Sequence, residues 1–408
     1  MLDNSNIEYL TSNNQNSVRL NKKPKINHLE VILKITERCN LNCDYCYVFN
    51  RGGYDKDDSP PIFSLAYTHK LGHLLHEACD KYQIDFIRVD LHGGEPLLYK
   101  PRRFDELCSV LKSYIPKETL LEFCLQTNGV LINDEWIDVF EKHKVAVAVS
   151  LDGVRQVNDL HRLDHKGKSS YEDTVRGLRI LQDAFAKGRL VSRPSLLSVI
   201  NPAANGSETY RHFVGDLNLK SFDFLLPDIH HGDTGYDLAG VSRFIKDALN
   251  EWFADNDPTI YVRLFESQMS ALAGKPAYFM GMGQQVAEAF AFTIGTNGNI
   301  YVDDTLRPTQ NEIFAPIGNL MSVTLTDILD SPQMRLFLSE SARLPDGCSD
   351  CIWKKICGGG RLVNRFDPAG SFSKRTVLCE PTRSMLSQIT STLLQGGFDR
   401  EKLIERLT

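Results

Sequence analysis

The sequence lacks any apolar run of about eighteen residues, the length that a membrane-spanning helix needs. Its first 27 residues, rich in Asn, Ser and Lys, contain no apolar core segment, so we expect neither a signal peptide nor an anchor. An excess of positive charge is also missing, because 46 basic residues face 52 acidic ones for a net charge of −6. These absences predict a cytoplasmic protein with no membrane partner and no nucleic-acid partner.

The composition is otherwise ordinary for a chain that buries a sizeable core: 42% of the 408 residues are apolar and 24% are charged. A cytosolic chain of this size needs no disulfides, so its ten cysteines indicate metal or redox chemistry. Seven of them form two groups along the sequence: Cys39, Cys43 and Cys46, then Cys348, Cys351, Cys357 and Cys379.

Apolar, strand-like segments alternate with amphipathic, helix-like segments in the first half of the chain. Strands are predicted over 31–36, 86–92, 121–127, 145–151, 195–200 and 222–226. Strands separated by helices imply a parallel sheet, and six such units, rather than eight, leave a barrel open on one side. The predicted fold class is therefore α/β, a partial (β/α)6 barrel resembling a TIM barrel.

The pattern changes near residue 227, where Pro, His, Gly and Asp cluster. We predict four parts: an N-terminal arm over 1–28, the barrel over 29–235, a bridging helical region over 236–290, and a cysteine-bearing domain with C-terminal helices over 291–408. Within 290–302, Thr-Asn-Gly stands between two strand-like runs and predicts a β-hairpin.

The first cysteine group has the spacing Cys39-x3-Cys43-x2-Cys46 and directly follows the first predicted strand. Thiolates are ligands for [4Fe–4S] clusters, and three of them leave one iron of a cubane open to a substrate. Zinc is the alternative, but a structural zinc site takes four ligands. The loops after the strands of parallel barrels carry the chemistry, which favours the iron–sulfur cluster.

Four motifs in order resemble those of the radical S-adenosylmethionine (radical SAM) superfamily. Besides the cysteine segment with its aromatic Tyr45, they are His92-Gly93-Gly94-Glu95-Pro96, Gln126-Thr127-Asn128-Gly129 and Ser150-Leu151-Asp152-Gly153. Each of them lies at the end of a predicted strand. A single Gly-Gly or Asn-Gly is a common turn, whereas four in this order are specific.

The resemblance implies that Cys39, Cys43 and Cys46 hold a [4Fe–4S] cluster that splits S-adenosylmethionine into methionine and a radical that abstracts hydrogen. It also implies an electron donor such as flavodoxin or ferredoxin. The residues that it places at the cofactor are Tyr45, Gly93, Gly94, Glu95, Pro96, Asn128, Ser150, Asp152, Arg162 and Val199. For Arg162 a surface ion pair is an equal alternative.

The late cysteines resemble the SPASM extension of radical enzymes that modify peptides, which usually carries two auxiliary clusters. This chain has Phe292-Thr293-Ile294 and Val302-Asp303-Asp304 where the extension has further cysteines. We therefore expect one auxiliary [4Fe–4S] cluster in a SPASM-like domain. Its ligands would be Cys348, Cys351, Cys357 and Cys379. A structural zinc site with the same four cysteines is the alternative.

The abbreviated extension resembles maturases that form three-residue cyclophanes in ribosomal peptides, including the darobactin type. This resemblance implies a precursor peptide, with leader and core, as the partner, and aromatic-ring-to-Cβ crosslinks as the product. The alternatives are an ether crosslink, oxidation of a Cys or Ser side chain as in anaerobic sulfatase maturation, and, from another class, a zinc-stabilised binding protein without catalysis.

Such a crosslink removes two hydrogens, of which the radical takes one as an atom. The other leaves as a proton and an electron, so the reaction needs a base as well as the auxiliary cluster. The candidate bases are His92 and Asp304, and the position of Asp304 resembles that of the catalytic aspartate of the family. A turn aspartate that caps its own backbone and a packed histidine are the structural alternatives.

Overall fold

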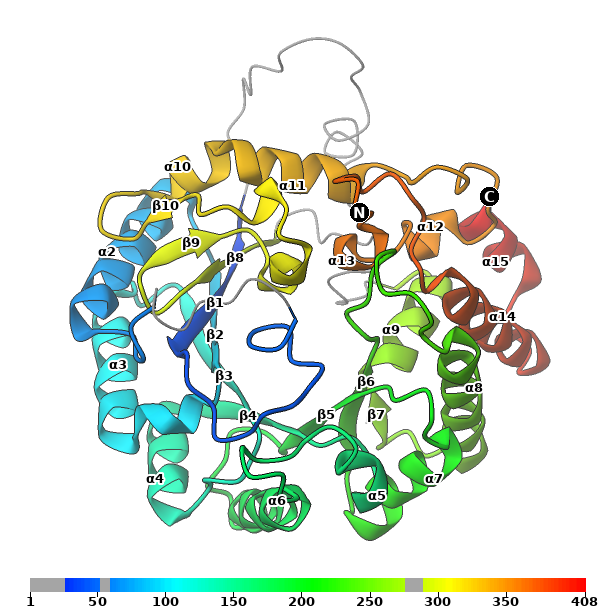
Figure 1. The fold of residues 1–408 in the computed structure, drawn as a ribbon, viewed down its shortest axis with the longest axis horizontal. Helices are drawn as coiled ribbons and strands as arrows, with labels where there is room; N and C mark the ends of the chain where they lie inside the picture. The colour runs from blue at the N-terminus through cyan, green and yellow to red at the C-terminus, as the bar shows by residue number, and fades with distance from the viewer. Residues whose placement is uncertain (1–25, 52–58, 276–288) are drawn as a thin grey trace.

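The computed structural model describes residues 26–51, 59–275 and 289–408. Most of the arm predicted over 1–28 lies outside these residues, and within it Ile26 is already buried and the first strand begins at His28. Figure 1 shows the strands forming an open arc with helices around its outer side. The predicted α/β fold, an incomplete barrel around a parallel sheet, is confirmed.

A ten-stranded sheet forms the wall of the arc in the order β10-β9-β8-β1-β2-β3-β4-β5-β6-β7. Its strands are β1 (His28–Thr36), β2 (Phe86–Gly93), β3 (Leu120–Thr127), β4 (Val145–Ser150), β5 (Ser195–Val199), β6 (Ser221–Leu225), β7 (Tyr261–Val262), β8 (Ala289–Ile294), β9 (Asn299–Tyr301) and β10 (Gly318–Asn319). Neighbours from β8 to β7 are parallel, whereas β8, β9 and β10 pair antiparallel. All six predicted strands are present, and the predicted hairpin is β8 and β9.

Helices follow the strands of the barrel and cover its outer side (Figure 1). They are α2 (Leu65–Tyr82), α3 (Pro101–Tyr114), α4 (Asp134–His143), α5 (Arg155–Asn158), α6 (Tyr171–Ala186), α7 (Gly206–Arg211), α8 (Leu238–Asp255) and α9 (Arg263–Leu272), with shorter turns at η2 (Pro96–Tyr99) and η3 (His212–Asp216). Ser64 and Asn133 begin α2 and α4, because their side chains accept hydrogen bonds from the first turn. No helix of the described residues is long and apolar enough to cross a bilayer.

The two faces of the sheet differ in burial. Leu29, Val31 and Leu33 of β1 are fully buried in the apolar core, and such side chains contribute about 1.5–3 kcal/mol each to stability. The alternate residues, which face the inside of the arc, are half-buried in the first part of β1 and in β2 and β5. The inside of the arc is thus accessible, unlike the filled interior of a closed TIM barrel.

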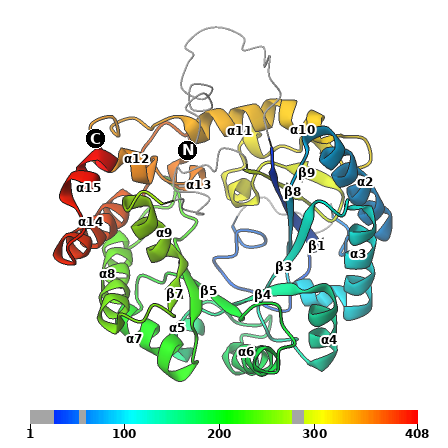
Figure 2. The same cartoon turned by 180° about the vertical axis from the view of Figure 1, so that it is seen from behind.

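The cysteine-bearing C-terminal part joins the barrel through β8, which pairs in parallel with β1. Its further elements are η4 (Asp304–Thr309), η5 (Glu312–Phe314), α10 (Leu325–Asp330), α11 (Pro332–Ala342), α12 (Lys354–Cys357), α13 (Leu362–Arg365), α14 (Cys379–Gln395) and α15 (Arg400–Leu407). Seen from behind in Figure 2, α14 packs beside α8. The predicted domain limits at 235 and 290 stay predictions.

The bridging region differs from its predicted form in one respect. The region over 236–290 is predicted to be helical, but the short strand β7 separates α8 from α9 and pairs with β6. The two-residue strand is too short to leave an alternating pattern in the sequence. Residues 276–288 of the same predicted region lie outside the described residues.

Candidate active site

The loop after β1 carries the first group of cysteines: Cys39, Cys43 and Cys46. The loop contains a tight turn, in which the Cys46 N–H donates to the Cys43 carbonyl at 3.1 Å. The Asn42 N–H donates to the Leu163 carbonyl at 2.8 Å, and this bond ties the loop to a distant segment of the chain. Burial, followed by the negative charge of Glu95 and of the two other thiolates, raises the pKa of Cys39 to about 12. Burial thus disfavours a free thiolate here, whereas three cysteines on one loop are the donor set of a [4Fe–4S] cluster, which fits this loop.

A glycine turn packs directly beneath this loop. Gly93 has a φ of +148°, and a Cβ there would lie 2.1 Å from the Thr36 carbonyl oxygen. At Gly94 a Cβ would lie 2.3 Å from the Arg38 carbonyl oxygen. The Gly94 N–H donates to the Thr36 carbonyl at 2.8 Å. Only glycine allows the two backbones to approach this closely.

We expect Gly94→Ala to lower the melting temperature, because the new methyl group overlaps the Arg38 carbonyl and overpacking costs about 1–3 kcal/mol. Gly215→Ala is the matched control, since a Cβ at Gly215 meets nothing within 4 Å. Differential scanning calorimetry measures both variants. Equal melting temperatures for the two would show that the turn tolerates a side chain.

Glu95 links this turn to the next motif. Its Oε1 accepts hydrogen bonds from the Leu97 N–H at 3.0 Å and the Thr127 hydroxyl at 2.7 Å, and its Oε2 accepts one from the Asn128 N–H at 2.8 Å. Burial raises the pKa of Glu95, and these donors oppose the rise. Pro96 follows and begins η2. Glu95 thus fixes the turn that contains Asn128, while its place at the cofactor stays a prediction.

Four predicted cofactor residues meet beyond the ends of β4 and β5: Tyr45, Asp152, Arg162 and Val199. Asp152 accepts hydrogen bonds from the Tyr45 hydroxyl and, at 2.9 Å, from the Val199 N–H. Arg162 donates to the Tyr45 oxygen at 2.8 Å. Arg162 is buried, and its Nε has no hydrogen-bond partner within the described part of the chain. A buried donor without a partner is costly, so this site fits an anionic group such as the carboxylate of S-adenosylmethionine.

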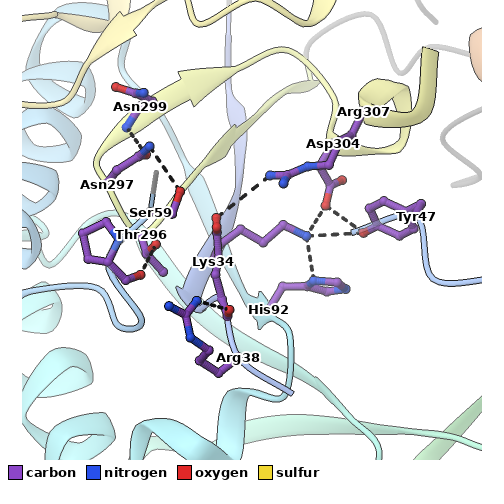
Figure 3. A network of polar contacts seen from close by, with 12 residues as sticks. Lys34, Arg38, Tyr47, Ser59, His92, Thr296, Asn297, Asn299, Asp304 and Arg307 are labelled. Atoms are coloured by element: carbon purple, nitrogen blue, oxygen red, sulfur yellow. Dashed lines mark hydrogen bonds and ion pairs between the residues drawn. The ribbon is translucent and has the colours of Figure 1, made fainter. Parts of the chain in front are cut away.

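A second network stands at the ends of β1 and β2 and is drawn in Figure 3. The Lys34 ammonium contacts Asp304, lies 2.9 Å from His92 Nδ1, and donates to the Tyr47 hydroxyl at 3.3 Å. Tyr47 in turn donates to Asp304 Oδ2 at 2.7 Å. Both predicted bases, Asp304 and His92, therefore belong to one cluster.

This network continues along the strand ends as far as β4. His92 Nε2 lies 3.1 Å from Gln126 Oε1, and the Gln126 amide donates to the Ser150 hydroxyl at 3.3 Å. Ser150, which was predicted at the cofactor, is connected by this chain to His92. The row of contacts thus joins the residues predicted to hold the cofactor to those predicted to act as bases.

The charges of the network set its protonation. Burial alone would raise the pKa of Asp304, but the Lys34 ammonium and the hydrogen bonds from Lys34 and Tyr47 hold it below its usual range. Burial and the same ammonium lower the pKa of His92 to about 4. At neutral pH the cluster therefore contains a carboxylate, an ammonium and a neutral imidazole.

The late cysteines surround one small cavity: Cys348, Cys351, Cys357 and Cys379 line it. Burial, and then the neighbouring thiolates, raises the pKa of Cys357 to about 11. Lys354, Arg375 and Arg383 also line the cavity and offer positive charge to an anionic cluster. Among the described residues, no three His, Cys, Asp or Glu side chains converge as a single metal ion requires. A structural zinc site with the same four cysteines stays the alternative to the predicted cluster.

The sequence analysis missed Lys34 and Tyr47, and it named Gln126 only as part of a motif, without a role. Lys34 could have been noticed, because it is a charged residue within the otherwise apolar run over 31–35. Tyr47 carried no signal of its own, and the motif that contains Gln126 did not indicate its contact with His92, since both contacts join residues far apart in the chain.

Comparison with known proteins agrees with this geometry. The model of the radical SAM superfamily matches residues 33–201. The serine-type anaerobic sulfatase-maturating enzyme of Bacteroides thetaiotaomicron is 23% identical over 80% of this chain and 81% of its own length. The cysteine-type anaerobic sulfatase-maturating enzyme of Clostridium perfringens is 24% identical over 79% and 85%. The solved structure of native anSMEcpe with bound AdoMet superposes with a TM-score of 0.77 at 20% identity, over 90% of this chain and 99% of that one, and so shares the fold.

These findings bear on the alternatives that the sequence left open. None of these relatives is a cyclophane-forming maturase, so that finer resemblance has no support from them. The non-catalytic zinc protein is wrong, because the loop with Cys39, Cys43 and Cys46 lies in a radical SAM domain. That superfamily implies S-adenosylmethionine and a [4Fe–4S] cluster. Residues 33–201 form a radical SAM domain, and the chain is a radical S-adenosylmethionine enzyme.

Proposed function

We propose that this enzyme oxidises a Cys or Ser side chain within a polypeptide, in line with its similarity to serine-type and cysteine-type anaerobic sulfatase-maturating enzymes. The observation that carries the proposal is that their similarity extends over about four-fifths of the chain, well beyond the radical SAM domain. The carboxylate of Asp304 supports it, because it stands on η4 in the C-terminal part yet reaches the strand ends of the barrel.

The residues of the chain divide into binding and proton-handling groups. Cys39, Cys43 and Cys46 would hold the cluster, and Arg162 with its unpaired Nε would hold the cofactor. Bound together, and reduced by a flavodoxin or ferredoxin, the cluster and S-adenosylmethionine supply a group that abstracts a hydrogen atom. Asp304 would accept the proton that leaves the same side chain.

The oxidation must also release an electron. A Cys side chain, with its thiol on a methylene carbon, loses one hydrogen atom, one proton and one electron to give a thioaldehyde, which water converts to an aldehyde and hydrogen sulfide. A Ser side chain gives the aldehyde directly by the same loss. We propose that an auxiliary [4Fe–4S] cluster held by the four late cysteines accepts the electron.

Crosslinking of a precursor peptide is the second candidate. One observation favours it: β8 and the segment after β9 contain no cysteine. The four late cysteines that line one cavity therefore account for a single auxiliary site. Both reactions remove two hydrogens from the peptide, but on a Cys side chain hydrolysis of the thioaldehyde then also exchanges the sulfur for oxygen. The two candidates differ in whether an aldehyde forms.

Mass spectrometry of two peptides tests the proposal. The reconstituted enzyme is incubated anaerobically with the Kp18Cys peptide, which a structural neighbour binds, and is separately co-expressed with the small peptide encoded nearest its gene. A product that reacts with a hydrazine supports side-chain oxidation. A peptide lighter by two hydrogens without an aldehyde supports crosslinking. If 5′-deoxyadenosine forms while both peptides stay unchanged, a polypeptide is not the substrate.

The auxiliary site predicts a specific iron content. Two clusters correspond to about eight iron atoms per chain, and we expect a Cys348→Ala/Cys379→Ala variant to retain about four. It should still form 5′-deoxyadenosine but oxidise little peptide, because the electron has no acceptor. Iron and sulfide analysis with Mössbauer spectroscopy measures this. An unchanged iron content in the variant would contradict the site.

The protonation of the network predicts the pH dependence. Because the pKa of His92 is lowered to about 4, its imidazole is neutral from about pH 6 to 8 and becomes a cation beside Lys34 only in acid. We therefore expect peptide oxidation to be flat over that range and to fall below about pH 5. A fall with a midpoint near the ordinary histidine pKa of about 6.5 would contradict the network.

A further inference from the structure

Lys34 is a charged residue in a place that normally excludes charge. It is 1% exposed, and among the described residues it is the one lysine that is buried. It stands near the end of β1, where neighbouring positions carry apolar side chains. Burying an ammonium costs several kcal/mol unless it is well paired, so a specific set of partners must keep it there.

The partners match the donors of an ammonium group in number. Its three N–H bonds have three acceptors: Asp304 Oδ2, His92 Nδ1 at 2.9 Å and the Tyr47 oxygen at 3.3 Å. Since Lys34 can only donate, His92 Nδ1 must accept, and the imidazole proton lies on Nε2. That proton then points to Gln126 Oε1 at 3.1 Å.

The same contacts orient the carboxylate. Within the described part of the chain, the Lys34 ammonium and the Tyr47 hydroxyl both bind Oδ2 of Asp304. Oδ1 is therefore the oxygen that remains for a proton from a substrate. A carboxylate fastened at one oxygen keeps the other in a fixed direction, which is what proton transfer in the reacting complex requires.

We propose that Lys34 is a positioning residue for the oxidation: its ammonium holds Asp304 with Oδ1 toward the substrate side chain and holds His92 as the Nε2–H tautomer. This inference rests on the proposed function, in which Asp304 takes the substrate proton. It assigns Lys34 no contact with the cofactor, so hydrogen abstraction itself should survive its loss.

Lys34→Met tests the inference, because methionine keeps the length of the side chain and removes the ammonium. We expect the ratio of oxidised peptide to 5′-deoxyadenosine to fall about 30-fold or more, with 5′-deoxyadenosine release reduced less than about threefold. Lys220→Met is the matched control, since it removes a lysine from an ion pair with Asp257 at 2.9 Å, away from the site, and should keep the parental ratio.

A second variant guards against misfolding. Tyr47→Phe removes the other donor to Oδ2 but keeps the ammonium, and we expect a fall in the ratio of less than about fivefold. For Lys34→Met, an unchanged ratio, or an equal loss of both products, would overturn the positioning role. A parent enzyme that forms 5′-deoxyadenosine but oxidises no peptide would instead overturn the proposed function and this inference with it.

Discussion

Asp304→Asn will uncouple the enzyme, so that 5′-deoxyadenosine still forms while oxidised peptide falls by about 100-fold or more, the range of a lost general base. Asparagine has nearly the same shape and can still accept from Lys34 and Tyr47, but its amide cannot take up a proton. Liquid chromatography with mass spectrometry measures both products in one anaerobic reaction.

Asp330→Asn is the control for this prediction. It removes a carboxylate from an exposed pair with Arg335, at 3.1 Å and outside the network, and should behave as the parent. If Asp304→Asn oxidises peptide at the parental rate, Asp304 is not the proton acceptor. The same measurement on His92→Asn would then show whether His92 has this role.

Cys43→Ala will abolish cofactor cleavage. Removal of one of the three thiolates on the loop after β1 leaves too few ligands for the cluster, and the metal site loses its affinity. We expect no detectable 5′-deoxyadenosine, and an iron content that falls to that of the auxiliary cluster alone. Electron paramagnetic resonance of the reduced protein, with and without S-adenosylmethionine, measures the loss.

Cys79→Ala is its control. Cys79 is a buried thiol of α2 in the apolar core, so its replacement should leave the iron content and cofactor cleavage intact. Cofactor cleavage by Cys43→Ala at the parental rate would mean that this loop does not hold the reactive cluster.

The barrel could be predicted because its signals are local. Each strand is a short apolar run followed by a periodic helix, and turn residues mark the places where loops begin. The hairpin at β8 and β9 was also marked locally, by Asn297 and Gly298 between two apolar runs. No local pattern indicated the parallel pairing of β8 with β1, because this pairing joins residues more than 200 positions apart.

The site could be predicted in its motifs but not in its connections. Tyr45, Asp152, Arg162 and Val199 were each named from the sequence, and the structure adds that they contact one another. Asp304 was named as a base, whereas its partner Lys34 was not. The sheet brings the two together, and only the fold determines which charges meet at the strand ends.

The site of the late cysteines could also be predicted only in part. Their clustering predicts a metal site, but nothing in the spacing requires Cys379, which comes later in the chain, to be a ligand. The structure places it beside the same cavity as Cys348, Cys351 and Cys357. The first residue of α14 thereby meets the loop before α12, a proximity that comes from the packing of helices rather than from sequence distance.

Deuterium transfer tests the central claim most directly. A peptide with two deuterium atoms on the Cβ of its reactive Cys or Ser is incubated anaerobically with the reconstituted enzyme, S-adenosylmethionine and a reductant. Direct abstraction from a polypeptide side chain predicts one deuterium in the 5′-deoxyadenosine and an aldehyde in the peptide. Unlabelled 5′-deoxyadenosine beside an unchanged peptide would contradict the account.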